Sequence, residues 1–405
     1  MKDIKTLKVL SISHVPLESN YGAGTSLRLH WRAMLPQISA GLIEPHLITR
    51  IVLRDVIGGK NISKSIRGKP FFLHRNFILP FELNYERGNL TCVKEFRMKM
   101  SSVIHKAIFK IYAGRLIEVI ELEKHDVVHL NSVVLAPVAR AIKNRLGVRS
   151  PYIILHVREF LDNKISKKQI SDICAADYFI CIDVAAKKRF INTAGVTLTK
   201  RCSVINNPFF TPQNIIHGDV FVNDKTDIKR FAIAGGVTSD KGVLRVCEAF
   251  LGAEIPDAVL YIVGAGAGPY YEKVKNLVVG SNEKCRLLGE LDQLSERGFY
   301  NSIDVLIRGD KSFRTGRTVY EALYAGASVV FPGSVSDLES DTELYRFKDQ
   351  IYLFEPNSSQ KLIEALVKAS RFIIPSERTL RTHLDNFKQY RERMSQIYFA
   401  HRQSG

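Results

Sequence analysis

The feature that most constrains the fold is a regular alternation of short apolar runs with helical patterns along nearly the whole chain. Each apolar run has the length of a buried strand, and the segment that follows it has helical spacing of its apolar residues. Strands separated by helices pair in parallel, because each crossover returns the chain to the same edge of the sheet. The alternation is interrupted by the polar stretch Thr211–Lys229 and resumes at Arg230. The sequence therefore predicts two doubly wound α/β domains, residues 1–208 and 209–375.

One stretch of the second domain, Asp304–Gly333, combines this pattern with an unusual distribution of charge. It predicts a strand, a polar loop, a helix that begins at Gly316, and a second strand. Arg317 falls in the first helical turn, where a cation is normally disfavoured unless an anion binds the free amides. Phosphate is the obvious anion, and Glu321, one turn later, would face a pair of hydroxyls such as those of ribose. The alternative is an ordinary strand–helix–strand unit with a solvated loop.

The same stretch resembles the C-terminal motif of retaining nucleotide-sugar glycosyltransferases of the GT-B fold, the large family-four type. The residues that carry the resemblance are Gly316, Glu321-Ala322 and Ala325-Gly326. The family has a second Glu eight positions before Glu321, where this chain has Phe313. The resemblance implies two facing Rossmann-like domains with a cleft between them. It also implies that the C-terminal helix, here residues 376–405, crosses back to the first, acceptor-binding domain.

The loop that follows the first strand of the second domain is similar to the family's phosphate-binding loop. Lys241-Gly242 matches the end of that pattern, whereas Gly236, after Gly235, stands where the family has Arg. The resemblance implies that Lys241 neutralises the departing diphosphate. Arg308 and Arg317 are the candidates to replace the missing Arg, with Arg314 a weaker one.

The remaining site residues also follow from the resemblance. His156 ends a predicted strand, as does the family histidine that lies beside the transferred sugar. Gly22 and Gly24 follow the first strand in a loop that would face the donor phosphates. Gly289 and Leu291 would lie near the nucleotide base. Structural alternatives remain open: a plain strand-to-helix turn for the glycines and a core position for His156.

A glycine-rich turn in the second domain also fits a different class of protein. Gly264, Gly266 and Gly268 follow a strand and precede a helix, and Glu290 lies at the distance expected of an NAD site. Pro269 occupies the position that needs Gly or Ala in a dinucleotide fingerprint. An oxidoreductase is therefore the less favoured reading. The sequence has no Asp-x-Asp motif and no His/Cys cluster with ligand spacing, so we expect no metal and no cofactor.

A net charge of +17 could be explained by three kinds of partner: nucleic acid, an anionic membrane surface or phosphate-bearing substrates. No nucleic-acid recognition motif accompanies the charge, which leaves phosphate-bearing substrates or an anionic membrane. Residues 50–115 are strongly basic, and Val93–Ala113 has the pattern of a basic amphipathic helix that could lie on anionic lipid. A core-facing helix with a basic back is the alternative. The short apolar run near the N-terminus and the absence of a CxxC pair among the cysteines favour a cytoplasmic protein, and the basic region would allow it to lie peripherally on the inner face of the cytoplasmic membrane.

The resemblance, together with these features, implies a retaining glycosyltransferase that uses a UDP- or GDP-linked sugar. The acceptor would be a glycan or a lipid-linked molecule, as in the assembly of a bacterial surface polysaccharide. Phe313 leaves two alternatives open: a change of donor sugar, or a non-catalytic partner subunit of an active transferase. A GT-B sugar-nucleotide epimerase would need acid and base carboxylates that the sequence does not identify.

Overall fold

The computed structural model places most of the chain in two compact units. Unit 1 comprises Met1–Asn207 with Gln389–Gly405, and unit 2 comprises Pro208–Lys388. The structure describes residues 5–15, 22–49, 72–73, 113–114, 116–159, 161, 165–209, 228–291, 294, 298–373 and 383–400. The predicted basic amphipathic helix, Val93–Ala113, and the region 50–115 around it lie almost entirely outside these residues.

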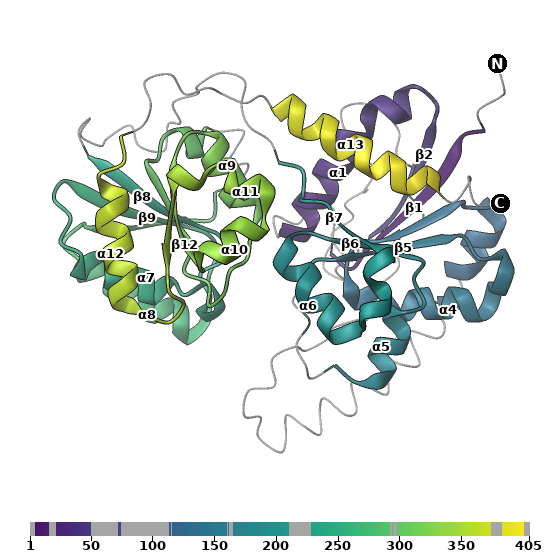
Figure 1. Cartoon of the computed structure of the whole chain (residues 1–405), viewed down its shortest axis with the longest axis horizontal. Helices are drawn as coiled ribbons and strands as arrows, with labels where there is room; N and C mark the ends of the chain where they lie inside the picture. Colours follow the sequence, from purple (N-terminus) through teal and green to yellow (C-terminus); the bar gives the residue numbers. More distant parts are fainter. Residues whose placement is uncertain are drawn as a thin grey trace, which may run out of the picture. The chain divides into compact units, whose positions relative to one another are not determined.

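Unit 1 is built on a parallel sheet with the strand order β3-β2-β1-β4-β5-β6-β7 (Figure 1). The strands are β1 (Leu7–Ser13), β2 (Ile43–Thr49), β3 (Phe72–Leu73), β4 (Val127–Leu130), β5 (Tyr152–Val157), β6 (Tyr178–Cys181) and β7 (Cys202–Val204). The chain moves outward from β1 in one direction, then returns to its other side at β4. This reversal between β1 and β4 is the point at which open parallel sheets bind ligands.

Helices cover both faces of the unit 1 sheet. They are α1 (Gly22–Ser39), α4 (Ala136–Leu146), α5 (Lys167–Ile173), α6 (Val184–Ala194) and the part of α13 (His383–Ala400) from Gln389 onward. Side chains alternate along each strand, so Ile153 and Leu155 of β5 join the core formed with α4 and α6. His156 lies on the opposite face, with α1 and α13.

The first helix begins earlier than the sequence suggested. Gly22 and Gly24 were expected in a loop after the first strand, but α1 begins at Gly22. The first-turn amides of a helix make no intrahelical hydrogen bond, so glycine costs less there than in a helix interior. Gly22 and Gly24 are therefore part of a helix N-terminus that follows β1.

Unit 2 has a second parallel sheet, with the order β10-β9-β8-β11-β12-β13. Its strands are β8 (Lys229–Ala234), β9 (Ala258–Val263), β10 (Cys285–Gly289), β11 (Val305–Ile307), β12 (Ser328–Pro332) and β13 (Ile351–Phe354). All of the strand pairings that the structure describes in both sheets are parallel. The order reverses between β8 and β11, which makes their following loops neighbours.

The helices of unit 2 also lie on both sides of its sheet (Figure 1). They are α7 (Val243–Gly252), α8 (Gly268–Val279), α9 (Arg317–Tyr324), α10 (Val335–Ser340), α11 (Thr342–Tyr345) and α12 (Ser359–Ser370). Helices α7, α8 and α12 share one core with inward residues of β8, β9 and β11. Among the described residues, no helix is both long enough and apolar enough to span a bilayer.

Candidate functional site

The loops that follow β8 and β11 meet at the strand-order reversal of unit 2. Lys241 ends a short 3-10 turn, Ser239–Lys241, and Gly242 has the left-handed φ of +61°. A Cβ atom on Gly242 would lie 2.1 Å from the carbonyl oxygen of Gly309. Only glycine permits both this backbone conformation and this approach. The Lys241-Gly242 pair therefore positions the lysine against the loop after β11.

Asp310 joins the two cations of these loops. Lys241 Nζ donates to Asp310 Oδ1 at 2.9 Å, and Arg308 Nε donates to Asp310 Oδ2 at 2.7 Å. Arg308 Nη2 also lies 2.7 Å from the same Oδ2 atom, so two guanidinium nitrogens share one carboxylate oxygen and Lys241 takes the other. Asp310 and Arg308 are buried, whereas the Lys241 side chain retains 30% of its exposure. The cluster carries one net positive charge.

Burial and neighbouring charge compete in setting the pKa values of this cluster. Burial is the largest influence on Asp310 and acts to raise its pKa, but the charges of Arg308 and Lys241 outweigh it and lower the pKa. Burial and then the charge of Arg308 lower the pKa of Lys241, against the opposing effect of Asp310. A bound anion would favour the charged form of Lys241 and relieve its repulsion with Arg308.

Helix α9 begins directly beside Arg308. The N-cap residue, Gly316, makes no side-chain hydrogen bond to the first turn. Arg308 Nη1 donates to Thr318 Oγ1 at 3.1 Å, and a Cβ atom on Gly316 would lie 2.6 Å from Nη1. The absence of a side chain at Gly316 therefore admits the guanidinium to the helix N-terminus, where the helix dipole and a cation act together on an anion.

Arg317 and Glu321 lie on the same face of α9, as the sequence predicted. Arg317 Nε lies 3.0 Å from Glu321 Oε1, and Glu321 is 4% exposed. Arg317 Nη1 is buried and has no hydrogen-bond partner in the part of the chain that the structure describes. Burial raises the pKa of Tyr300 well above its ordinary value, and the adjacent Glu321 carboxylate raises it further. Glu321 is thus held between Arg317 and Tyr300.

Phe313 packs inside unit 2. It is 8% exposed, and its ring centroid lies 4.9 Å from that of Phe331 at the end of β12. Its ring also lies against Gly333, where a Cβ atom would be 2.6 Å from Cδ2. The aromatic residue that replaces the family Glu therefore belongs to an aromatic cluster under the loop.

The glycine-rich turns after β8 and β9 pack on one another. A Cβ atom on Gly264 would lie 1.8 Å from the carbonyl oxygen of Gly235, and one on Gly266 would meet the Tyr271 ring at 2.1 Å. Gly264 N donates to the carbonyl oxygen of Gly289 at 2.8 Å, which joins the turn after β10 to the same edge. Contacts within the protein thus account for two glycines of the apparent dinucleotide fingerprint. Gly236 and Leu291 follow β8 and β10 at this edge.

In unit 1, His156 lies near the C-terminal end of β5 and is fully buried. Its Nδ1 atom faces His129 Nε2 at 3.3 Å and Arg158 Nη2 at 3.4 Å, and its Nε2 atom has no hydrogen-bond partner among the described residues. The two residues that follow β5, Arg158 and Glu159, are hydrogen bonded to the segment after β4. Ser132 donates to Glu159 Oε1 at 2.5 Å, and Arg158 Nη2 donates to Asn131 Oδ1 at 2.7 Å.

No protein-family model and no curated protein matches the sequence. Solved structures do match over nearly the whole chain. HepE of Anabaena, in complex with UDP, is 14% identical with a TM-score of 0.64, covering 97% of this chain and 100% of that one. The chain has the GT-B fold.

Two further structures with this fold differ in what they act on. Sucrose-phosphate synthase of Thermosynechococcus elongatus is 14% identical with a TM-score of 0.63, covering 98% of this chain and 100% of that chain. The lipopolysaccharide outer core galactosyltransferase WaaB, in its apo form, is 14% identical with a TM-score of 0.57, covering 97% of each chain. At such low sequence identity, the structural match establishes only the architecture of this GT-B chain. Its chemistry must be argued from its own residues.

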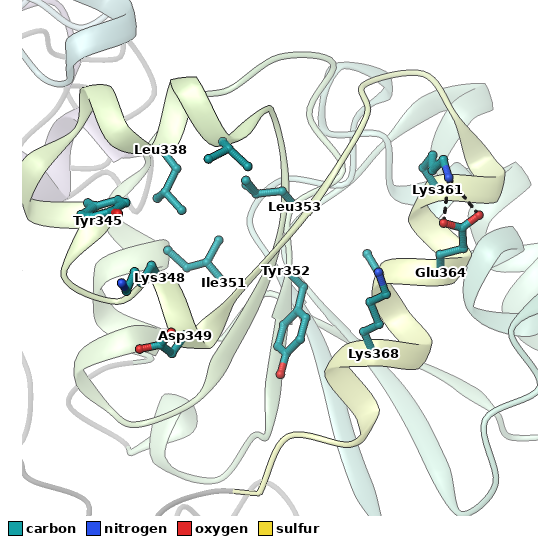
Figure 2. A pocket seen from close by; sticks show the side chains of 12 residues that line it. Leu338, Tyr345, Lys348, Asp349, Ile351, Tyr352, Leu353, Lys361, Glu364 and Lys368 are labelled. Atoms are coloured by element: carbon teal, nitrogen blue, oxygen red, sulfur yellow. Dashed lines mark hydrogen bonds and ion pairs between the residues drawn. The ribbon is translucent and has the colours of Figure 1, made fainter.

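A groove of about 610 Å³ lies elsewhere in unit 2 (Figure 2). It runs between α10–α11, the edge strand β13 and α12, and is lined by residues such as Tyr345, Tyr352 and Lys368. It shares no residue with the loops after β8 and β11. Its Lys361–Glu364 pair, at 3.0 Å, joins two residues of the same helix. Within the described residues, no group of three or more His, Cys, Asp or Glu side chains could hold a metal ion.

Two residues of the site did not stand out from the sequence. Asp310 comes two positions after Arg308, and its spacing in a polar loop gives no sign that it bridges to Lys241, which is 69 positions away in the chain. Tyr300 lies in the 3-10 turn Phe299–Asn301 before β11. The sequence marks Asp310 only as one of several charged residues in the loop after a buried strand, and Tyr300 has no signal at all.

Proposed function

We propose that this chain is a glycosyltransferase that takes its sugar from a nucleoside diphosphate sugar. The observation that carries the proposal is the arrangement at the start of α9. The buried Arg317 Nη1 atom lacks a partner among the described residues, and Arg317 is the first residue of an uncapped helix whose first turn is contacted by Arg308 of the Lys241–Asp310–Arg308 cluster. A buried guanidinium donor without a partner is costly unless a ligand supplies an acceptor. Phosphate oxygens fit this need in charge and geometry.

The same groups suit the departure of a diphosphate. Negative charge on the leaving group grows in the transition state, so cations and helix amides that are already in place stabilise that state more than the ground state. Lys241 and Arg308 are held by Asp310 and Arg317 by Glu321, so little reorganisation is needed when the charge develops. The loops bring three cations to one edge of the sheet, and we propose on that basis that these side chains take the charge-stabilising role and that the reaction is metal-independent.

The remaining roles follow the resemblance. We propose that Glu321 binds the ribose, that Gly289 and Leu291 contact the base, and that Gly235, Gly236 and Gly316 give the phosphates access to backbone amides. His156 would contact the transferred sugar, with Gly22 and Gly24 at the N-terminus of α1. Retention of the anomeric configuration and a glycan or lipid-linked acceptor in surface polysaccharide synthesis complete the proposal. UDP is the favoured nucleotide, because UDP is bound in the HepE structure.

Calorimetric titration of the full chain with UDP, GDP, ADP, CMP and NAD tests the donor site. We expect one nucleoside diphosphate to bind, and Lys241→Ala and Arg317→Met each to weaken its affinity at least tenfold, or by about 1.4 kcal/mol. Lys273→Ala is the matched control, because Lys273 is an exposed lysine of the same unit on α8. We expect that variant to bind as the wild type does.

The competing functions predict different titrations. Binding of NAD alone would contradict the transferase and favour the dinucleotide reading of Gly264–Gly268. No binding of any of the five compounds would favour a non-catalytic partner subunit. If the donor site is confirmed, nuclear magnetic resonance of the anomeric proton in the product decides between retention and inversion.

A further inference from the structure

A chain of five buried side chains connects the C-terminal helix of unit 1 to His156. They come from α1 (His30), β4 (His129), β5 (His156) and α13 (Tyr390 and Tyr398), and none is more than 3% exposed. Tyr390 Oη lies 2.9 Å from His30 Nδ1, and Tyr398 Oη lies 3.0 Å from His30 Nε2. Tyr398 Oη is also 2.8 Å from His129 Nδ1, and His129 Nε2 is 3.3 Å from His156 Nδ1.

Arg158 sets the direction of this chain. A guanidinium has only donors and keeps its charge, so a nitrogen that faces it must be an acceptor. Arg158 Nη2 lies 3.4 Å from His156 Nδ1. The guanidinium is itself held by the side chain of Asn131 and by Asn207. His156 Nδ1 therefore carries no proton, and in the neutral ring the proton must reside on Nε2.

The donor and acceptor roles of each side chain then determine those of the next. Two unprotonated nitrogens would repel through their lone pairs, so His129 Nε2 carries the proton that faces His156 Nδ1. His129 Nδ1 is then an acceptor and takes its hydrogen bond from the hydroxyl of Tyr398. That hydroxyl, having used its proton, accepts from His30 Nε2, and His30 Nδ1 accepts from the hydroxyl of Tyr390.

We propose that Arg158, facing Nδ1, fixes His156 as the Nε2–H tautomer, a hydrogen-bond donor to an oxygen of a bound ligand, and that Tyr390 and Tyr398, through His30 and His129, are positioning residues that hold the ring in this state. His156 Nε2 is the buried end of the chain and has no acceptor among the described residues. A donor at that atom selects a hydroxyl, ether or phosphoryl oxygen and disfavours a ligand that presents an N–H or a cation.

The electrostatics of the network agree with three neutral rings. Burial, followed by the charge of Arg158, lowers the pKa of His129 to about 3. Burial, then Arg158 and the two other histidines, lower the pKa of His156 well below its ordinary value. Burial, then His129 and Arg158, do the same for His30. Three uncharged imidazoles can pass on a preference for one tautomer, whereas a protonated ring would have donors at both nitrogens and would end the chain.

This inference rests on the proposed function only for the identity of the ligand, which would be the transferred sugar through one of its hydroxyls. The tautomer is a property of the protein alone. The test below needs no nucleotide and no acceptor, so its failure and the failure of the proposed function are distinguishable.

The test is nuclear magnetic resonance of the full chain with isotope-labelled histidine, in which the ring nitrogen shifts report each tautomer. The chain has 11 histidines, and single His→Gln variants assign the three of interest. At about pH 7, near which ordinary histidines titrate, we expect His30, His129 and His156 each to be neutral with the proton on Nε2. A proton on Nδ1 of His156, or a charged ring there, would overturn the proposal.

The substitution Tyr398→Phe interrupts the chain of hydrogen bonds at its centre. Loss of the hydroxyl removes the donor to His129 Nδ1 and the acceptor for His30 Nε2, so we expect the Nδ1 signal of His129 to shift as that nitrogen loses its hydrogen bond, with the proton still on Nε2 because Arg158 continues to face His156. Tyr178→Phe is the control, since its hydroxyl pairs with Ser203 Oγ at 2.6 Å in the same unit. Unchanged His129 signals in a folded Tyr398→Phe protein would also overturn the proposal. If that variant does not fold, the wild-type tautomer of His156 still decides.

Discussion

At the scale of single residues, Asp310 is the group on which the candidate phosphate site depends. It is the anion between Lys241 and Arg308, and it is 6% exposed. Removing its charge leaves two cations close together in a largely buried place. Breaking a buried pair in this way destabilises a protein by about 3 kcal/mol, because the remaining charge has lost its compensation.

The first prediction is therefore that Asp310→Asn lowers the free energy of unfolding by about 3 kcal/mol. Urea unfolding followed by circular dichroism measures the change. Asp240→Asn is the matched control, because Asp240 is exposed in the neighbouring loop, and we expect it to alter stability by less than about 0.5 kcal/mol. Equal effects of the two substitutions would show that the bridge contributes nothing.

The same carboxylate gives a pH dependence with a definite sign. The pKa of Asp310 is lower in the folded protein than in the unfolded chain, where an aspartate has a pKa of about 4. Its contribution is present in full above that unfolded value and is lost as the pH falls through the lowered folded value. We expect the stability difference between wild type and Asp310→Asn to be constant above about pH 5 and to shrink below about pH 4. A difference that grew on acidification would contradict the bridge.

Phe313 gives a residue-scale prediction about the departure from the family motif. Phe313→Glu would place a carboxylate against Phe331 and Gly333 in a position that is 8% exposed. We expect a loss of at least about 3 kcal/mol in the free energy of unfolding, and below about 1.5 kcal/mol for Phe313→Leu. Denaturant titration of both variants measures this. A stable Phe313→Glu protein would mean that the ring can be replaced without repacking.

At the scale of elements, the site depends on how closely the loop after β8 approaches the loop after β11. Gly242 combines a φ of +61° with a would-be Cβ contact of 2.1 Å to a backbone oxygen. Gly268 has a similar φ of +79° but nothing within 4 Å of a would-be Cβ atom. The comparison separates the cost of the backbone conformation from the cost of the contact.

We expect Gly268→Ala to lower the free energy of unfolding by about 1 kcal/mol, the cost of a left-handed residue with a side chain. Gly242→Ala adds a clash with backbone and should cost at least about 3 kcal/mol in total. It should also abolish nucleotide binding, since the two loops must separate. Equal effects of the two substitutions on stability would show that the loops can adjust without cost.

At the scale of the whole molecule, the end of the chain completes the core of its beginning. Tyr398 and Met394 of α13 are fully buried in unit 1, and Tyr398 is hydrogen bonded to residues of both α1 and β4. The chain has a single tryptophan, Trp31 of α1, which is fully buried beside His30. Its fluorescence therefore reports the unfolding of unit 1.

We predict that a chain ending at Lys388 loses the cooperative Trp31 fluorescence transition while circular dichroism retains a transition from unit 2. The physical reason is that removal of several buried side chains exceeds the stability of an ordinary domain. A full-length Arg391→Ala protein, altered at a partly exposed position of α13, is the control. An unaltered Trp31 transition in the shortened chain would show that unit 1 does not need α13.

The sequence indicated the architecture because the strands and crossover helices of a parallel sheet have local sequence patterns. Strands buried on both faces must be short and apolar, and their crossovers must have helical spacing, as in Tyr152–Val157 and the helix Val243–Gly252. The starts of helices were less certain: α1 begins at Gly22, in a segment that was expected to be a loop, because first-turn positions tolerate glycine. The pairing of Arg317 with Glu321 was also accessible, since one turn of helix places them on one face.

What the sequence determined by itself was the α/β class, the positions of most strands, and the charged helix start at Gly316. These follow from rules that act over a few residues. Only the tertiary structure decided that Asp310 joins Lys241 to Arg308, that Phe313 packs under the loop on Phe331, and that Tyr398 reaches His129. These contacts join residues that lie far apart in the chain or turn on which way a side chain faces, and periodicity carries no information about either.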